Sequence, residues 1–344
     1  MRCNAKGMMP HLKTTPTRAP SPITFSIAGS GIYLPRHILP SDEIDNRLGW
    51  PAGQCAQRYG LTQRHIAAPD ETTSFMAAAA ARAALQNADM PPSALDLIIG
   101  ACGVMEQPIP STAALVQNRL GLGQSGGAAY DVNATCLSFV QAFELAVMRI
   151  SLGLARNVLV FSADIASAAL DWSNPDAAAI FGDGAAAVVL TAGPSQLLAH
   201  RFATYGAGHE ICRLEGGGTR LGVHGAAAQN LFQMDGAQAF RYAARHMPAF
   251  LAALLDDAGC RLDDLACVIP HQASGPALAR EIARLGIDPA RVVNTYTRCG
   301  NQIAASIPTA LHHARANGQL KAGDRALIIG TSAGISLGGM VVQI

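Results

Sequence analysis

Three polar side chains stand where they could carry out nucleophilic chemistry on an acyl group. Cys136 begins a strongly helical run after the strand-like entry DVNAT. A thiol there faces unpaired backbone N–H groups and the positive end of the helix dipole, and both favour the thiolate. His271 follows the strand-like segment VIP, and Asn301 stands in a glycine turn before a helix. A cysteine with a distant histidine and asparagine is a recurring nucleophilic arrangement.

Each of these residues also has a simpler structural interpretation. A cysteine that opens a core helix is more often a small buried side chain than a nucleophile. A single histidine is more often hydrogen-bonded within the structure, and a single asparagine in a turn commonly serves the turn. Spacing alone does not bring the three side chains together, so the case depends on the elements that carry them.

The pattern of the chain favours an α/β fold, because apolar runs alternate with helical stretches throughout. Strands are expected at residues 96–101, 157–162, 185–190, 266–270 and 325–330. Helices are expected at residues 73–87, 111–120, 136–152, 237–257, 275–285 and 307–317. Alanine is abundant in several of these helices, which suits helix formation and close packing.

Two segments far apart in the chain resemble each other. FGDGAAAVVL (181–190) and GISLGGMVVQI (334–344) are both glycine turns that lead into a hydrophobic strand, and each closes about half of the protein. This similarity indicates a duplicated α/β unit. We expect a loose N-terminal tail over residues 1–22, one half over residues 23–194 and a second half over residues 195–344.

Composition narrows the function classes. The 344 residues are 50% hydrophobic and 14% charged, with a formal net charge of +1. Such a chain is too apolar to be disordered, and it lacks the basic excess of a nucleic-acid or anionic-membrane binder. The most apolar long stretch, 136–153, contains Gln141, Glu144 and Arg149, so a buried helix fits it better than a membrane span of about 18 or more apolar residues.

The cysteine pattern points to a reducing compartment. Eight cysteines are scattered without CxxC pairs, so neither a zinc site nor a disulfide framework is indicated. We therefore expect a cytoplasmic protein whose partners are small molecules or proteins.

A series of motifs along the chain raises the catalytic interpretation of Cys136. DVNATC, FGDGAAA, MDGAQAF, PHQAS, GNQIAASIP and GTSAGISLGG follow one another in the order, and at roughly the separations, of the β-ketoacyl-acyl-carrier-protein synthase III family. The chain resembles this family of the thiolase-like superfamily from about residue 23 to residue 344. The resemblance implies a five-layered αβαβα fold of two similar halves, usually assembled as a homodimer.

The resemblance also implies roles for individual residues. Cys136 would attack an acyl thioester and carry the acyl group, while the backbone N–H groups of Cys136 and Ala333 would form the oxyanion hole. His271 and Asn301 would donate hydrogen bonds to the thioester carbonyl of a malonyl group. Decarboxylation would leave an enolate that attacks the acyl-cysteine and yields a β-ketoacyl thioester. The substrates would be thioesters of coenzyme A or of acyl carrier protein, and no metal or redox cofactor would be needed.

The chain departs from the family pattern where coenzyme A is bound. A tryptophan and an arginine commonly sandwich the adenine, but Gln54 and Pro175 stand at these positions. Arg58 is retained near the first, Ser274 replaces a usual asparagine after the histidine, and Arg241 keeps a basic residue at the mouth of the site. Losing stacking and charged contacts should weaken the capture of coenzyme A. A carrier protein could hold the donor instead.

The acyl pocket also differs from the family pattern. Ile109 stands where a phenylalanine from the neighbouring subunit often caps the pocket, and Thr331 stands where another phenylalanine lies near the cysteine. Smaller residues leave more room. We therefore expect an acyl chain that is longer, branched or aromatic.

Three functions remain open at this level. The first is decarboxylative Claisen condensation, in fatty-acid synthesis or in a specialised pathway with quinolone-like or polyketide-like products. The second is acyl transfer from the same cysteine to an alcohol or amine without a new carbon–carbon bond. The third is a catalytically silent subunit that supports an active partner.

Overall fold

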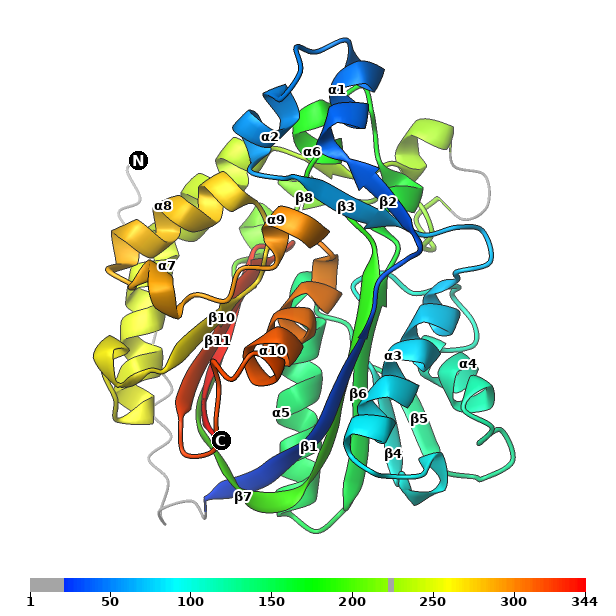
Figure 1. The fold of residues 1–344 in the computed structure, drawn as a ribbon, viewed down its shortest axis with the longest axis vertical. Helices are drawn as coiled ribbons and strands as arrows, with labels where there is room; N and C mark the ends of the chain where they lie inside the picture. Colours follow the sequence, from blue (N-terminus) through cyan, green and yellow to red (C-terminus); the bar gives the residue numbers. More distant parts are fainter. Residues whose placement is uncertain (1–21, 222–225) are drawn as a thin grey trace, which may run out of the picture.

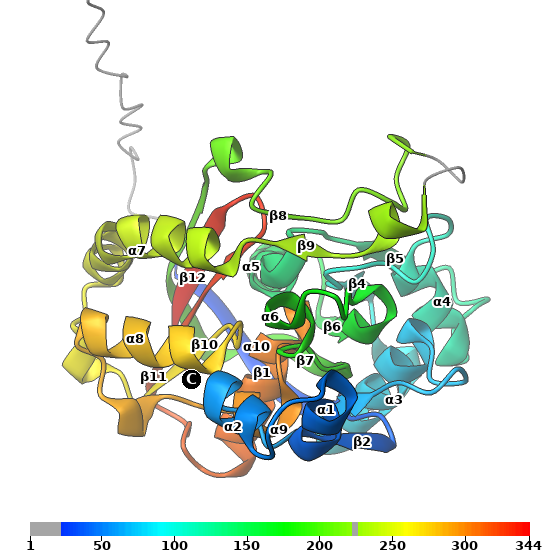
Figure 2. The ribbon, with the colours of Figure 1, turned by 90° about the horizontal axis from the view of Figure 1, so that it is seen from above.

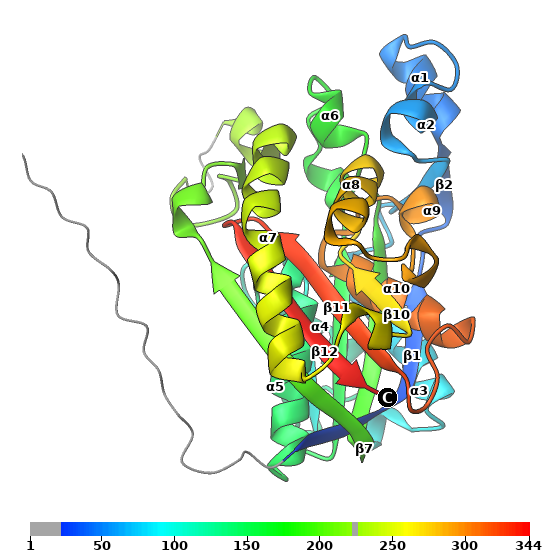
Figure 3. The same cartoon turned by 90° about the vertical axis from the view of Figure 1, so that its left-hand side faces the viewer.

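The computed structural model describes residues 22–221 and 226–344. Its layers alternate helix, sheet, helix, sheet and helix (Figures 1 and 3). This is the five-layered α/β arrangement of two similar halves that the family resemblance implied. Apart from residue 22, the tail predicted for residues 1–22 lies outside the described residues.

One eight-stranded sheet supplies both sheet layers, because strand β7 passes from one layer into the other. In β7 (Gly184–Thr204), residues 184–191 pair with β6 and residues 196–204 pair with β12. The strand order is β10-β11-β12-β7-β6-β4-β5, and β1 also pairs with β7. These strands are β1 (Ile23–Tyr33), β4 (Leu97–Gly100), β5 (Ala128–Asp131), β6 (Asn157–Asp164), β10 (Cys267–Pro270), β11 (Arg325–Ser332) and β12 (Ser336–Gln343). The two predicted halves therefore share β7.

Two helices form the central layer, and two more cover each outer face. The central pair is α5 (Ser138–Ser151) and α10 (Ser306–Ala316). The outer helices are α3 (Thr73–Asn87) and α4 (Thr112–Arg119) on the N-terminal layer, and α7 (Gly236–Ala258) and α8 (Gly275–Leu285) on the C-terminal layer. Figure 1 shows α3 and α4 at one side of the central pair and α7 and α8 at the other.

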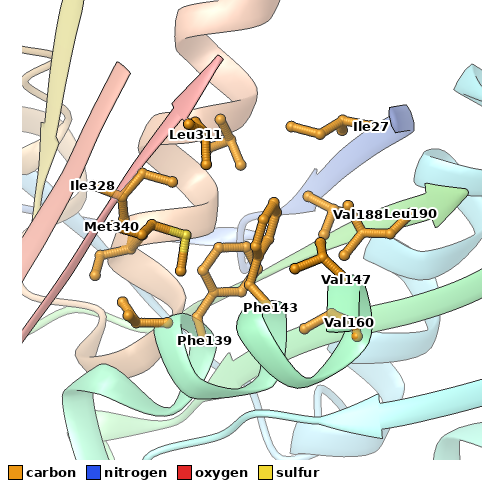
Figure 4. Close-up of a cluster of buried hydrophobic side chains, with 14 of the residues drawn as sticks. Ile27, Phe139, Phe143, Val147, Val160, Val188, Leu190, Leu311, Ile328 and Met340 are labelled. Atoms are coloured by element: carbon orange, nitrogen blue, oxygen red, sulfur yellow. The ribbon is translucent and has the colours of Figure 1, made fainter. Parts of the chain in front are cut away.

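The strands alternate their side chains between two cores, as a period of two requires. Val188 of β7 faces the central helices, whereas its neighbour Val189 faces α3 and α4. Figure 4 shows Phe139 and Phe143 of α5 in the central core, with Met340 on one side and Val188 on the other. These two phenylalanines and the apolar residues around them fix α5, and with it the turn directly before α5, where Cys136 lies.

The two halves repeat one local structure at the centre of the molecule. The 3₁₀ turn η2 (Thr135–Leu137) precedes α5, and the 3₁₀ turn η9 (Ile303–Ala305) precedes α10. Thr135 and Ile303, the first residues of these turns, both have φ of 51°. The first helical residue after each turn is a serine whose hydroxyl contacts the carbonyl three residues back, at 2.7 Å for Ser138 and 2.9 Å for Ser306. The structure thus carries the duplication that the glycine turns indicated.

Short elements form a cap at one end of the layers, seen from above in Figure 2. Their shared apolar core includes Leu61 and Phe181. Outside the main sheet and the helices that cover it, the α-helices and strands of the described chain are α1 (Ser41–Leu48), α2 (Gln54–Tyr59), α6 (Pro175–Ala178), α9 (Tyr296–Cys299), β2 (His37–Pro40), β3 (Gln63–Ile66), β8 (Cys212–Arg213) and β9 (Gln233–Met234).

The sequence prediction of the elements is confirmed for the long helices and incomplete for the strands. Helices 73–87 and 275–285 have the predicted bounds, and the other predicted helices and strands are present with shifted ends. The strand predicted at 185–190 is part of the much longer β7. β1 was not predicted: Ile23, Phe25 and Ile27 alternate with polar residues at its start, but small residues interrupt this pattern over residues 28–31. At Gly29 a Cβ would lie 2.2 Å from the Ala84 carbonyl oxygen, so the close packing of α3 requires such residues.

Candidate active site

Cys136 lies in the middle of η2, directly before the central helix α5. The preceding Thr135 adopts the left-handed conformation, which turns the chain sharply at the thiol. Ser138 holds this turn, because its hydroxyl accepts the Ala134 N–H at 2.9 Å and donates to the Thr135 carbonyl at 2.7 Å. The nucleophile candidate is therefore fixed by the turn and by the buried helix behind it.

Two backbone N–H groups face the Cys136 sulfur, those of Cys136 itself and of Ala333, and both lower its pKa. Ala333 lies in the turn between β11 and β12, whose ends pair Ser332 with Ser336. The C-terminal glycine loop and the start of α5 thus meet at the thiol. Two backbone N–H donors thus lie beside the sulfur of the nucleophile candidate.

The pKa of Cys136 nevertheless rises to about 12. Burial of the thiol is the largest cause, followed by the charge of Asp164 and by Cys212. The N–H groups favour the thiolate, as the sequence predicts, but desolvation of the thiol outweighs them. The raised pKa favours the protonated thiol at neutral pH in the free protein.

His271 directly follows β10 and is 6% exposed. Its backbone N–H donates to the Ile329 carbonyl at 2.8 Å, and its ring Nδ1 lies 2.7 Å from the Ser306 hydroxyl. Burial lowers the pKa of His271 to about 4, so the ring is neutral at physiological pH.

Gly330 allows His271 and the cysteine turn to approach each other. A Cβ at Gly330 would lie 2.6 Å from the His271 Cβ and 3.1 Å from a methyl carbon of Leu137, the residue after Cys136. Only a residue without a side chain fits between them without displacing one or the other. His271 and the turn that carries Cys136 are therefore neighbours on either side of Gly330.

Asn301 is 5% exposed and is held by the FGDG segment of the first half. Its backbone N–H donates to the Ile180 carbonyl at 2.8 Å, and its carbonyl accepts from the Gly182 N–H at 3.1 Å. Its side-chain Oδ1 accepts the Ile303 N–H at 2.9 Å, and Nδ2 donates to the Ala273 carbonyl at 3.3 Å. These contacts fix the orientation of the amide, and a primary amide keeps a second N–H for another acceptor.

Asp164 is a buried carboxylate at the centre of the site that the sequence analysis did not identify. It is fully buried and accepts the N–H groups of Gly103, Val104 and Ala304 at 2.8, 3.0 and 3.1 Å. Burial raises its pKa to about 7, against the effect of these donors. Because it lies between a loop of the first half and η9 of the second, it joins the two. The one signal in the sequence was an acid two residues after the predicted strand 157–162.

The residues predicted to bind substrate are spread over several elements. Arg58 of α2 is exposed and forms an ion pair with Asp176 at 2.8 Å. Arg241 is exposed on α7, and Ile109 is 85% exposed. Ser274 caps α8, three residues after His271. Thr331 lies in β11, two residues before Ala333.

Two tryptophans of the cap lie beside arginines, and the sequence analysis did not consider them. The Arg58 guanidinium lies 5.8 Å from the Trp50 ring centre, and the Arg47 guanidinium lies 5.0 Å from the Trp172 ring centre. Cation–π contacts at these distances are attractive. The contact between Arg47 and Trp172 could not be found from the sequence, because the two residues are far apart in the chain.

Two further searches cover the described residues alone. Within residues 22–221 and 226–344, no group of three or more His, Cys, Asp or Glu side chains could hold a metal ion. None of the helices in these ranges is both long enough and apolar enough to span a membrane.

Comparison with known proteins identifies the family. The model for 3-oxoacyl-acyl-carrier-protein (ACP) synthase III matches residues 130–206, and the model for its C-terminal part matches residues 255–344. A β-ketoacyl-acyl-carrier-protein synthase III from Mesorhizobium japonicum is 36% identical over 324 residues, covering 92% of this chain and 98% of that protein. The chain belongs to the β-ketoacyl-acyl-carrier-protein synthase III family. It is an acyltransferase of the condensing type.

Solved structures agree with this assignment. The 3-oxoacyl-acyl-carrier-protein synthase III from Aquifex aeolicus superposes with a TM-score of 0.85 at 34% identity, covering 93% of this chain and all of that one. The priming β-ketosynthase of a polyketide biosynthetic pathway superposes with a TM-score of 0.86 at 27% identity, covering 95% of this chain and 98% of that one. Condensing enzymes of primary and of specialised pathways thus share this fold.

The raised pKa of Cys136 predicts how its alkylation depends on pH. We expect iodoacetamide to react slowly near pH 7 and about ten times faster for each added pH unit up to about pH 10, because the thiolate fraction rises in this way below the pKa. Peptide mass spectrometry should follow the Cys136 adduct separately from those of Cys212 and Cys260, and Cys136→Ser serves as the control. A rate that levels off at or below about pH 8 would contradict the raised pKa.

Proposed function

We propose that this enzyme condenses an acyl thioester with a malonyl thioester to form a β-ketoacyl thioester, with Cys136 as the acyl carrier. The observation that supports this most strongly is the convergence of three distant segments. The N–H groups of Cys136 and Ala333 face one sulfur, and only Gly330 separates His271 from the cysteine turn. Asn301 reaches the same region through its bond to Ala273, two residues after His271.

In the first step the Cys136 sulfur attacks the thioester carbonyl. The two N–H groups hold the oxygen as it becomes negative, the bond to the leaving thiol breaks, and that thiol takes the proton that Cys136 gave up. The acyl group is then bound to Cys136. A buried site strengthens these hydrogen bonds, because less water competes for the oxygen.

In the second step a malonyl thioester replaces the leaving thiol. Its carboxylate departs as carbon dioxide, and the electron pair of the broken bond forms an enolate. His271 Nε2–H and Asn301 Nδ2–H donate to the enolate oxygen, where the charge develops. The enolate carbon attacks the acyl carbonyl, the bond to the sulfur breaks to free the product, and the Cys136 thiolate takes up a proton from water. These steps require no metal or redox cofactor.

We further propose that acyl carrier protein delivers the substrates. The relatives carry this protein in their names. Arg58, the retained basic residue of the nucleotide region, is paired with Asp176, which also accepts the Tyr59 hydroxyl at 2.6 Å. An acidic partner reduces the attraction of Arg58 for a nucleotide phosphate. Free coenzyme A should therefore be a weaker ligand than a thioester held by a protein.

The acyl chain that we propose is longer than acetyl, branched or aromatic. Ile109 and Thr331 leave more room than the phenylalanines commonly found at these positions. Mass spectrometry of the Cys136 adduct should show medium-chain acyl thioesters reacting faster than acetyl thioester. Much faster reaction of the acetyl thioester would contradict this substrate class.

We also propose a homodimer in the cytoplasm. Val104, Met105 and Ile109 are 42%, 47% and 85% exposed, and a second copy could cover this apolar patch. The seven cysteines in the described ranges are all unpaired, as a reducing compartment would keep them. Sedimentation at twice the chain mass of 35.7 kDa is the check on the dimer.

Release of carbon dioxide from malonyl thioester distinguishes condensation from both alternative functions. A non-condensing acyltransferase would load Cys136 but release no carbon dioxide from malonyl thioester. A silent subunit would do neither. The fixed amide of Asn301 favours condensation, because transfer alone has less need of a second donor to an enolate.

Three variants should separate the two steps. Cys136→Ala should form no acyl adduct but still release carbon dioxide from malonyl thioester. Asn301→Ala should form the adduct and lose about a hundredfold in decarboxylation, the size seen when one preorganised donor is removed. Asn317→Ala, an exposed asparagine that caps the end of α10, should behave as the wild type.

The readouts are the adduct mass and the release of labelled carbon dioxide. A wild type that acylates but releases no carbon dioxide would support transfer instead of condensation. A wild type that forms no adduct with any acyl chain or carrier would support the silent subunit.

A further inference from the structure

The Ser306 hydroxyl is a buried group that contacts His271 on the side away from the substrate. Ser306 begins α10 and is fully buried. Its oxygen lies 2.7 Å from His271 Nδ1, 2.9 Å from the Ile303 carbonyl oxygen and 3.4 Å from the Gln272 nitrogen. Among the described residues, Ser306 is the side chain that contacts Nδ1.

The hydroxyl carries one proton and can donate it either to Nδ1 or to the Ile303 carbonyl. That carbonyl already accepts the backbone N–H of Ser306. The carbonyl therefore has less need of the hydroxyl proton than Nδ1, which favours donation to the ring. The Gln272 N–H can donate to the same oxygen from another side.

A neutral imidazole has a single N–H, and the partner of one nitrogen decides which nitrogen carries it. If Ser306 donates to Nδ1, the ring proton is on Nε2, and His271 can donate to a thioester oxygen. If Nδ1 donates to Ser306, Nε2 has only a lone pair and would repel that oxygen. We propose that Ser306 is a positioning residue that holds His271 in the Nε2–H form required for decarboxylation.

The same turn also orients the second donor. The Ile303 N–H holds Oδ1 of Asn301, which directs Nδ2 outward, and the Ile303 carbonyl accepts the backbone N–H of Ser306. The Ile303 side chain is fixed in turn, because a Cβ at Gly103 would lie 2.3 Å from its Cγ2. One short turn therefore sets the polarity of both groups that face the enolate. This inference rests on the proposed role of His271 in condensation.

The test compares Ser306→Ala with a matched variant on the same helix. Thr309 is also fully buried, and its hydroxyl has no partner among the described residues. Thr309→Val thus removes a buried hydroxyl from α10 without touching His271. Ser306→Thr keeps the hydroxyl and is the conservative rescue. The readouts are carbon dioxide release from malonyl thioester, the rate of acyl adduct formation, and the ¹⁵N spectrum of histidine-labelled protein with His271 assigned by His271→Gln.

We expect the wild-type spectrum to report protonated Nε2 and bare Nδ1 for His271. Ser306→Ala should shift this signal toward a mixture of the two forms and lower the kcat of decarboxylation about tenfold, as loss of one hydrogen bond would. Its KM for malonyl thioester and its rate of adduct formation should change less than about twofold. Thr309→Val should match the wild type, and Ser306→Thr should recover the spectrum.

Two results would overturn the proposal. One is a wild-type spectrum with protonated Nδ1, and the other is a Ser306→Ala protein that keeps both the Nε2–H form and the wild-type kcat. A wild type that releases no carbon dioxide would instead refute the condensing function. In that case the spectra alone still decide whether Ser306 sets the tautomer.

Discussion

The left-handed turn at Ile303 is the constraint on which both proposed enolate donors depend. Its N–H fixes the Asn301 amide, and its carbonyl accepts the backbone N–H of Ser306, whose hydroxyl contacts His271. A β-branched residue at φ of 51° is strained, at a cost of about 1–3 kcal/mol. Contacts from the first half offset this strain, because Asp164 accepts the next N–H in the turn, that of Ala304. The geometry of the two proposed donors in the second half therefore relies on the first half.

Burial of the site shifts the pKa values of Cys136 and His271 in opposite directions. It raises the pKa of Cys136 to about 12, which keeps the nucleophile protonated in the free protein. It also lowers the pKa of His271 to about 4, so the ring remains a neutral donor with one N–H. The same low polarity strengthens every hydrogen bond to a developing oxyanion or enolate. The site therefore disfavours a thiolate at Cys136 or a positive charge on His271 in the free protein. It favours the negative charge that develops on the substrate during the reaction.

Patterns local to the chain could be predicted from the sequence, and pairings between distant segments could not. Periodic helices such as α3 and α8 were predicted to the residue, and the position of Cys136 before a helix was evident. Ala333 was found only through the family motifs, since nothing local marks it as a donor. Asp164 and Ser306 were missed because their partners lie 61 and 35 residues away, at Gly103 and His271. The position of Cys136 before a helix predicted the N–H groups that favour the thiolate, but not the desolvation that outweighs them.

The central claim is that His271 and Asn301 donate to one substrate oxygen beside the cysteine. A crystal structure of Cys136→Ala with a bound malonyl thioester analogue that cannot lose carbon dioxide tests it directly. We expect the thioester oxygen within about 3.2 Å of both His271 Nε2 and Asn301 Nδ2, the range of a hydrogen bond. A thioester oxygen bound elsewhere, or a His271 ring whose Nε2 points away from it, would contradict the account.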